Sequence, residues 1–309
     1  MKTTLSSESR AKLHNVSSLP QPILVSLAFF LVVLALRSID LFVLRLDELP
    51  DRIIFSMVIG FLLVLGYLRV LRRPIESIGL HARNFDKAFL IGALSLLILY
   101  ASLYAVQFYR VTLAGETPRL VFAAIDRETG TMGGLFFTLF KLVAQVFNAF
   151  MEESIFRGVI LPQLMLKFRF WKANVLQAFL FGLAHLVFPL SGWASGQVTA
   201  VEAATEAAFL MVFTTIGGLV FGYLYYRTDS LWTAVFAHLI DNAIGLFFHI
   251  QTASRLNAET DILMLASLGF VSLIILAWAV SSRFQLRTLR PWGTKEMPVQ
   301  ASPATIGVQ

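Results

Sequence analysis

The sequence predicts an all-α membrane protein, built as a bundle of about eight transmembrane helices, and three observations carry this prediction. Hydrophobic residues make up 57% of the 309 residues, whereas charged residues make up only 14%. In a soluble domain, by contrast, about a quarter of the residues are charged. The mean hydropathy is +0.73, and apolar runs long enough to cross a bilayer fill most of the chain.

Each apolar run of roughly 17 to 25 residues is a candidate span, because a helix of that length crosses the hydrocarbon core of a bilayer. The predicted spans lie near residues 22–36, 52–71, 88–109, 133–151, 173–190, 207–226, 231–250 and 262–281. The first span is short and follows basic residues, as a signal peptide would. It runs into Leu36-Arg37-Ser38 without a small-residue cleavage site, so we expect an uncleaved anchor.

These runs predict one transmembrane domain, residues 21–290, between two polar tails, residues 1–20 and 291–309. No internal repeat is visible. Gly218 and Gly222 in the sixth span have the small-residue spacing that lets two membrane helices approach closely. We interpret this pair as a packing feature inside the bundle.

Basic residues gather in alternate loops, and this pattern predicts the orientation of the chain. The loops after spans two, four and eight contain Arg69, Arg72, Arg73, Arg83, Lys87, Arg157, Lys167, Arg169, Lys172, Arg283, Arg287, Arg290 and Lys295. The loop 191–206 contains Glu202 and Glu206 but no Lys or Arg. The positive-inside rule therefore places both termini in the cytoplasm. A bacterial inner (plasma) membrane is the expected location.

Charge and cysteine content narrow the expected partners and chemistry. The net charge is +6, but the basic residues lie beside apolar runs, so lipid headgroups rather than nucleic acid are the expected partner. The chain has no Cys, which excludes disulfides, a cysteine nucleophile and a thiolate metal site.

Three short polar motifs interrupt the apolar runs. They are Glu152-Glu153-x-x-x-Arg157, Phe181-x-x-x-His185 and His238-x-x-x-Asn242. An ionisable residue in hydrocarbon costs about 2.5 to 3.5 kcal/mol on insertion scales, so each such residue is a candidate for function.

The first motif falls at the predicted cytoplasmic end of the fourth span. Glu153 and Arg157 are four residues apart, so they can pair on one face of a helix, while Glu152 points elsewhere. Both acids could simply mark a helix end, although the helix dipole disfavours negative charge there.

The other two motifs place single polar side chains in apolar helices. His185 follows Phe181 by one turn, and a lone histidine in such a run is often a packing residue. His238 and Asn242 share a helix face, where two buried polar groups need a partner or a cavity.

In this order, the three motifs resemble those of the CAAX protease and bacteriocin-processing family of intramembrane endopeptidases, which includes the type II CAAX prenyl endopeptidase. The resemblance covers the motif core, residues 133–250. It implies eight transmembrane helices around a conical cavity open to the cytosol. It also implies a peptide or protein substrate at the membrane, and no cofactor or metal.

The resemblance implies a role for each motif residue. Glu152 and His185 would activate a water molecule, and His238 and Asn242 would form the oxyanion hole. It further implies two supporting residues, Arg157 as the structural partner of Glu153, and Phe181 as part of the wall of the site.

Three alternatives remain open from the residues themselves. Glu152, His185 and His238 could together bind a catalytic zinc ion. Intramembrane Glu and His residues also serve in transporters and proton relays. A scaffold or immunity protein without proteolytic activity could retain the same fold.

Overall fold

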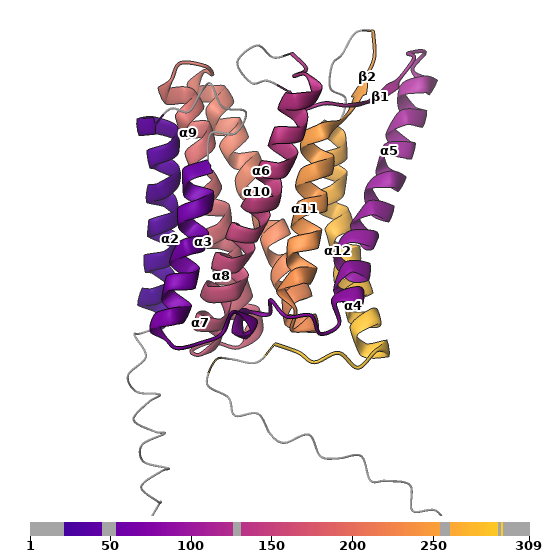
Figure 1. The fold of residues 1–309 in the computed structure, drawn as a ribbon. Helices are drawn as coiled ribbons and strands as arrows, with labels where there is room; N and C mark the ends of the chain where they lie inside the picture. The colour runs from indigo at the N-terminus through magenta and orange to yellow at the C-terminus, as the bar shows by residue number, and fades with distance from the viewer. Residues whose placement is uncertain (1–21, 45–53, 126–130, 254–259, 290–291, 293–309) are drawn as a thin grey trace, which may run out of the picture.

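The computed structural model describes residues 22–44, 54–125, 131–253, 260–289 and 292, in which long helices stand side by side (Figure 1). Within these ranges, five helical segments are long and apolar enough to cross a membrane: Pro22–Leu44, Phe85–Leu113, Leu135–Met165, Phe170–Ala194 and Ala200–Thr228. The shorter apolar helices are Ile54–Val70, Leu231–Phe247 and Leu273–Arg283. Each of the predicted spans coincides with one of these helices. The predicted all-α, multi-pass membrane bundle is therefore confirmed, while most of both predicted tails lies outside the described residues.

The chain forms these elements in order. The first half consists of α2 (Pro22–Ser38), η1 (Ile39–Leu44), α3 (Ile54–Val70), η2 (Ile75–Ile78), α4 (Phe85–Phe89), η3 (Leu90–Leu94), α5 (Ser95–Leu113) and β1 (Arg119–Phe122). The second half consists of α6 (Leu135–Glu153), η4 (Ser154–Ile160), α7 (Leu161–Met165), α8 (Phe170–His185), α9 (Val187–Ala194), α10 (Ala200–Thr228), α11 (Leu231–Phe247), β2 (Phe248–Gln251) and α12 (Thr260–Arg283).

The bundle is apolar outside, and its largely apolar interior also contains charged side chains. Large apolar side chains cover its surface, for example Leu31, Phe147 and Ile275, each more than half exposed. The buried side chains include the charged groups Arg37, Glu152, Glu153 and Arg157. An apolar surface with paired charges inside is expected where lipid surrounds the bundle.

Helices α8 and α10 pack against each other through small residues and amides. A Cβ added at Gly218 would lie 3.0 Å from Ala178 Cα, which is tighter than most Cβ contacts, so glycine favours this close approach. Gln177 Nε2 donates to the Gly218 carbonyl at 2.9 Å, and Asn174 Nδ2 donates to the Leu219 carbonyl at 2.9 Å. The predicted packing role of this glycine pair is confirmed.

Two predicted boundaries outside the candidate site differ from the structure. Residues 200–206, predicted as loop, form the start of α10, where the Thr199 side chain accepts from the Glu202 backbone N–H and Glu202 bonds back to Thr199. This reciprocal cap satisfies the free N–H groups of a helix start, so the helix begins earlier than hydropathy indicated. The seventh span ends at Phe247, because residues 248–251 pair with β1 as an antiparallel two-stranded sheet.

The loops predicted to share one side of the membrane meet at one end of the bundle. The Leu231 N–H donates to the Gly79 carbonyl at 3.0 Å, and the Leu289 N–H donates to the Tyr226 carbonyl at 2.8 Å. These contacts join the loops after spans two, six and eight, whereas β1 and β2 lie at the opposite end (Figure 1). The alternation of loops agrees with the topology prediction, and the side that faces the cytoplasm stays a prediction.

Candidate active site

The two acidic residues lie in the middle of a long helix. At Glu153 the α-helical pattern of α6 gives way to the π-helical segment η4, and the helix continues through α7 to Met165. The prediction that both acids stand at a helix end, with Arg157 in the loop beyond, was wrong. Glu152 is 1% exposed and Glu153 and Arg157 are 0% exposed. These charged groups have partners inside the bundle, so the helix can continue beyond them. A π turn within a helix often marks a functional site.

One carboxylate oxygen of Glu153 holds both Arg157 and His238. Arg157 Nη1 donates to Glu153 Oε1 at 2.8 Å, so the predicted pair is present. His238 Nδ1 lies 2.7 Å from the same oxygen. The Arg157 guanidinium also lies over the ring of Phe181, 4.3 Å from its centroid. A buried ion pair needs such additional contacts to offset its desolvation. Glu153 therefore supports Arg157 and also orients His238, which the sequence did not indicate.

His238 lies between the two carboxylates. Because the Glu153 carboxylate accepts hydrogen bonds, we assign a hydrogen to His238 Nδ1. Nε2 then faces Glu152 Oε2, 3.4 Å away. The ring of Phe221 stacks on the imidazole with centroids 5.3 Å apart, and the Phe181 ring lies perpendicular to it with centroids 6.0 Å apart. These contacts fix the imidazole in position and in tautomer.

His185 has its tautomer set by the backbone. Its Nδ1 lies 2.8 Å from the Phe181 carbonyl oxygen, one helical turn earlier. A carbonyl can only accept, so Nδ1 carries the hydrogen, and Nε2 of the neutral ring keeps a lone pair. The Phe181 ring contacts His185 at 4.7 Å as well as His238. Phe181 thus spaces the two imidazoles, in keeping with its predicted place in the wall of the site.

Asn242 faces a polar stripe on α6. Its Nδ2 donates to Gln145 Oε1 at 3.0 Å, and the amide has a second N–H for another acceptor. Gln145, Asn148 and Glu152 follow at intervals of three and four residues, so they share one helix face. The sequence analysis missed Gln145 because it treated this stretch as uniformly apolar. The helical spacing of these polar residues was the signal that could have found it.

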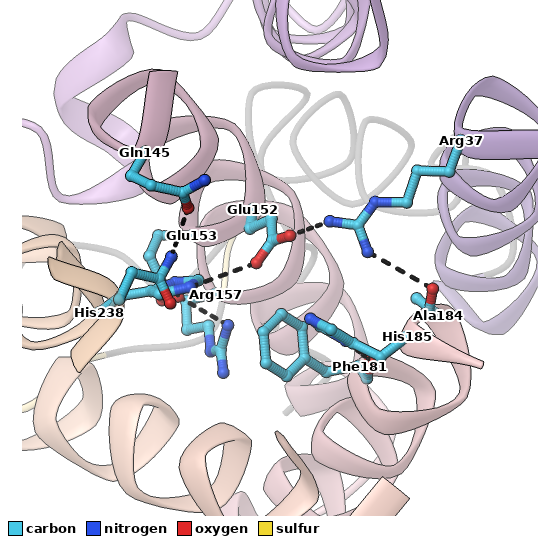
Figure 2. A network of polar contacts seen from close by, with 10 residues as sticks. Arg37, Gln145, Glu152, Glu153, Arg157, Phe181, Ala184, His185 and His238 are labelled. Carbon is cyan, nitrogen blue, oxygen red and sulfur yellow. Dashed lines mark hydrogen bonds and ion pairs between the residues drawn. The ribbon is translucent and has the colours of Figure 1, made fainter. Parts of the chain in front are cut away.

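Arg37 is a buried arginine that the sequence analysis also missed. It is 0% exposed and forms an ion pair with Glu152 Oε1. Figure 2 shows Glu152 between Arg37 on one side and the group of Glu153, Arg157 and His238 on the other. The first span was predicted to end at residue 36, which left Arg37 at its flank. Because the helix continues to Leu44, Arg37 lies inside a span of 23 residues. An arginine inside a membrane span is the signal that could have identified it.

The zinc alternative requires Glu152, His185 and His238 to lie close enough together to bind one ion. In the described part of the chain, no three His, Asp or Glu side chains are grouped so that they could hold a metal ion. Glu152 and His238 are close, but His185 does not complete a group of three with them. The predicted cavity open to the cytosol stays a prediction.

Comparisons with known proteins agree with the three motifs. A family model described as Type II CAAX prenyl endopeptidase Rce1-like matches residues 134–244, which contain every predicted site residue. The chain is 26% identical over 113 residues to the Bacillus subtilis protein named "Putative membrane peptidase YdiL". This alignment covers 37% of this chain and 38% of that protein, so well under half of either is matched. No solved structure matches the chain. Residues 134–244 of this membrane protein are therefore similar to the type II CAAX prenyl endopeptidase Rce1-like family, over the region that contains the three motifs.

Proposed function

We propose that the chain is an intramembrane endopeptidase in which Glu152 activates a water molecule for attack on a peptide bond of a membrane-associated substrate. The observation that carries this proposal is the state of the Glu152 carboxylate. Arg37 holds Oε1, while Oε2 accepts no hydrogen bond from the described protein groups and lies 3.4 Å from His238 Nε2. A fixed carboxylate with one acceptor oxygen available is suited to take a proton from water.

The charges of the site also suit hydrolysis. Arg37 and Arg157 balance Glu152 and Glu153, so these four groups are neutral together. When Glu152 takes a proton from water and the hydroxide adds to the carbonyl carbon, the negative charge moves from the carboxylate to the oxyanion. The proton then passes to the leaving amine as the C–N bond breaks, which restores the Glu152 carboxylate. The net charge is constant throughout, and this lowers the cost of the reaction in a dry interior.

The tautomers of His185 and His238 suggest which of them accepts a proton and which donates one. Nε2 of neutral His185 accepts, which fits a residue that shares the proton of the water with Glu152. His238 donates Nδ1–H to Glu153, so its Nε2 donates to the oxyanion only when the ring carries both protons. The second N–H of Asn242 supplies the other donor of the oxyanion hole.

The test is cleavage of a lipid-anchored, internally quenched peptide by the purified protein in nanodiscs. Glu152→Gln should lower kcat by about 10²- to 10⁴-fold, the usual contribution of a general base. The exposed Glu76 provides the matched control, and Glu76→Gln should cleave like wild type. Wild-type cleavage by Glu152→Gln, or ion flux without any cleavage by the wild-type protein, would show the proposal to be wrong.

We also propose that both termini face the cytoplasm of a bacterium, since the basic loops lie at one end of the bundle. The chain has no Cys, so single cysteines can be introduced for labelling in intact cells. A cysteine at position 167 should resist an impermeant reagent, and one at position 197 should react. Labelling of position 167 from outside would contradict this orientation.

A further inference from the structure

Arg37 joins the first membrane helix to both helices that carry the water-activating residues. Its Nη2 pairs with Glu152 on α6, and its Nη1 donates to the Ala184 carbonyl on α8 at 3.4 Å (Figure 2). The guanidinium also lies 5.4 Å from the centroid of the Phe188 ring. Ala184 directly precedes His185. One side chain therefore contacts the immediate surroundings of both Glu152 and His185.

The chemistry of a guanidinium suits this position. Burying a charge in a membrane interior is costly, so a fully buried arginine needs a compensating interaction. The planar fork can donate to two acceptors in fixed directions, whereas a lysine ammonium acts as a point charge. Here the two donors reach a carboxylate and a carbonyl on separate helices.

The ion pair determines which oxygen of Glu152 is available. With Oε1 engaged by Arg37, the carboxylate presents Oε2 towards His238 Nε2. Glu153 does not compete for Arg37, because its own Oε1 is shared by Arg157 and His238. Each glutamate thus has its own arginine.

We propose that Arg37 is a positioning residue for hydrolysis, which holds Oε1 of Glu152 and aims Oε2 at the reacting water. This inference rests on the proposed function of Glu152. It extends the active site beyond the matched region 134–244 to the first membrane helix. Arg37 acts through Glu152 and does not touch the substrate.

The experiment measures kcat and KM of Arg37→Met and Arg37→Lys in the nanodisc cleavage assay, with Arg69→Met at an exposed arginine as control. We expect Arg37→Met to lower kcat by about 10²-fold, the usual effect of a misplaced catalytic group, with KM unchanged. Arg37→Lys should recover part of the lost kcat because it restores the cation, and Arg69→Met should equal wild type.

A double variant keeps the test decisive if Arg37→Met alone folds poorly. Arg37→Met with Glu152→Gln removes both charges together, so it should fold better than Arg37→Met alone. Its residual kcat should equal that of Glu152→Gln, because Arg37 then has no carboxylate to position.

Several results would overturn the inference and leave the proposed function intact. The first is a kcat equal to or above wild type in folded Arg37→Met, and the second is a change in its KM alone. The third is a kcat of Arg37→Lys no higher than that of Arg37→Met, and the fourth is a kcat of the double variant below that of Glu152→Gln. Higher kcat would show that Arg37 restrains Glu152. If Glu152→Gln itself cleaves normally, the proposed function fails first.

Discussion

Two buried polar interfaces in this bundle differ in the charge that they carry. Between α8 and α10, the amides of Asn174 and Gln177 donate to backbone carbonyls of the facing helix, each at 2.9 Å. Where α6 meets η4 and α11, the contacts involve charged groups: Glu153 lies 2.8 Å from Arg157, one turn further along the same helix, and 2.7 Å from His238 on α11. Both interfaces lie inside the membrane bundle, but only the second contains charges.

The difference suggests that the neutral interface serves helix packing and that the charged one serves the reaction. A neutral amide bonded to a carbonyl stabilises a helix pair at little cost, and small residues let the backbones approach. Buried charges rarely stabilise a fold better than apolar residues would, so their presence is better explained by function. Changes in the charged centre should therefore affect turnover, and changes in the amide interface should affect stability alone.

After Glu152→Gln, Asn242→Ala should have the largest effect on turnover. Loss of one oxyanion donor should lower kcat by roughly 100- to 1,000-fold with little change in KM. The measurement is steady-state cleavage in nanodiscs, and Gln197→Ala, at an exposed amide, should leave kcat unchanged. An increase in KM with unchanged kcat would instead make Asn242 a substrate-binding residue.

Glu153→Gln should affect both turnover and stability. It weakens the support of Arg157 and the orientation of His238, because both bond to Glu153 Oε1. We expect kcat to fall roughly 10- to 100-fold, as when other histidine-orienting carboxylates are changed. The loss of one partner of a buried pair should cost about 3 to 5 kcal/mol of stability. Thermal unfolding equal to that of Glu76→Gln would contradict the structural half of this prediction.

Gly222→Ala should affect stability alone. A Cβ at Gly222 would overlap Asn174 Oδ1, whereas a Cβ at Gly66 would meet nothing within 4 Å. Overpacking of this kind costs about 1 to 3 kcal/mol, so Gly222→Ala should unfold at a lower temperature than Gly66→Ala. The folded fraction should keep wild-type kcat, and a loss of turnover in fully folded protein would weaken the contrast between the two interfaces.

Removal of metal ions should have the smallest effect. A glutamate-activated water needs no ion, so dialysis against a strong chelator should leave kcat unchanged. Activity that disappears with the chelator and returns with one zinc ion per chain would favour the zinc alternative.

The fold was largely predictable because the length of apolar runs determines the number of spans. The end of span four could not be predicted in this way, because Glu153 and Arg157 pair inside the bundle and the helix continues in π form through η4. The strand at residues 248–251 was also unpredictable, because it depends on pairing with the distant β1.

The motif residues of the candidate site could be named from the sequence, but several of their structural partners could not. Motif spacing identified Glu152, His185, His238 and Asn242 as candidates. Arg37 lies 115 positions from Glu152, so no local pattern connects them. The bond from His238 to Glu153 likewise depends on how α11 meets α6, which periodicity does not determine.

The central claim is tested most directly by measuring kcat and thermal unfolding together for Glu152→Gln and Gln177→Met. Glutamine at position 152 keeps an oxygen that can accept from Arg37, so we expect cooperative unfolding to persist while kcat falls by about 10²- to 10⁴-fold. Gln177→Met should unfold at a lower temperature, because it loses the hydrogen bond from Gln177 Nε2 to the Gly218 carbonyl of α10, and its kcat should be unchanged. Wild-type kcat in a folded Glu152→Gln protein would contradict the account.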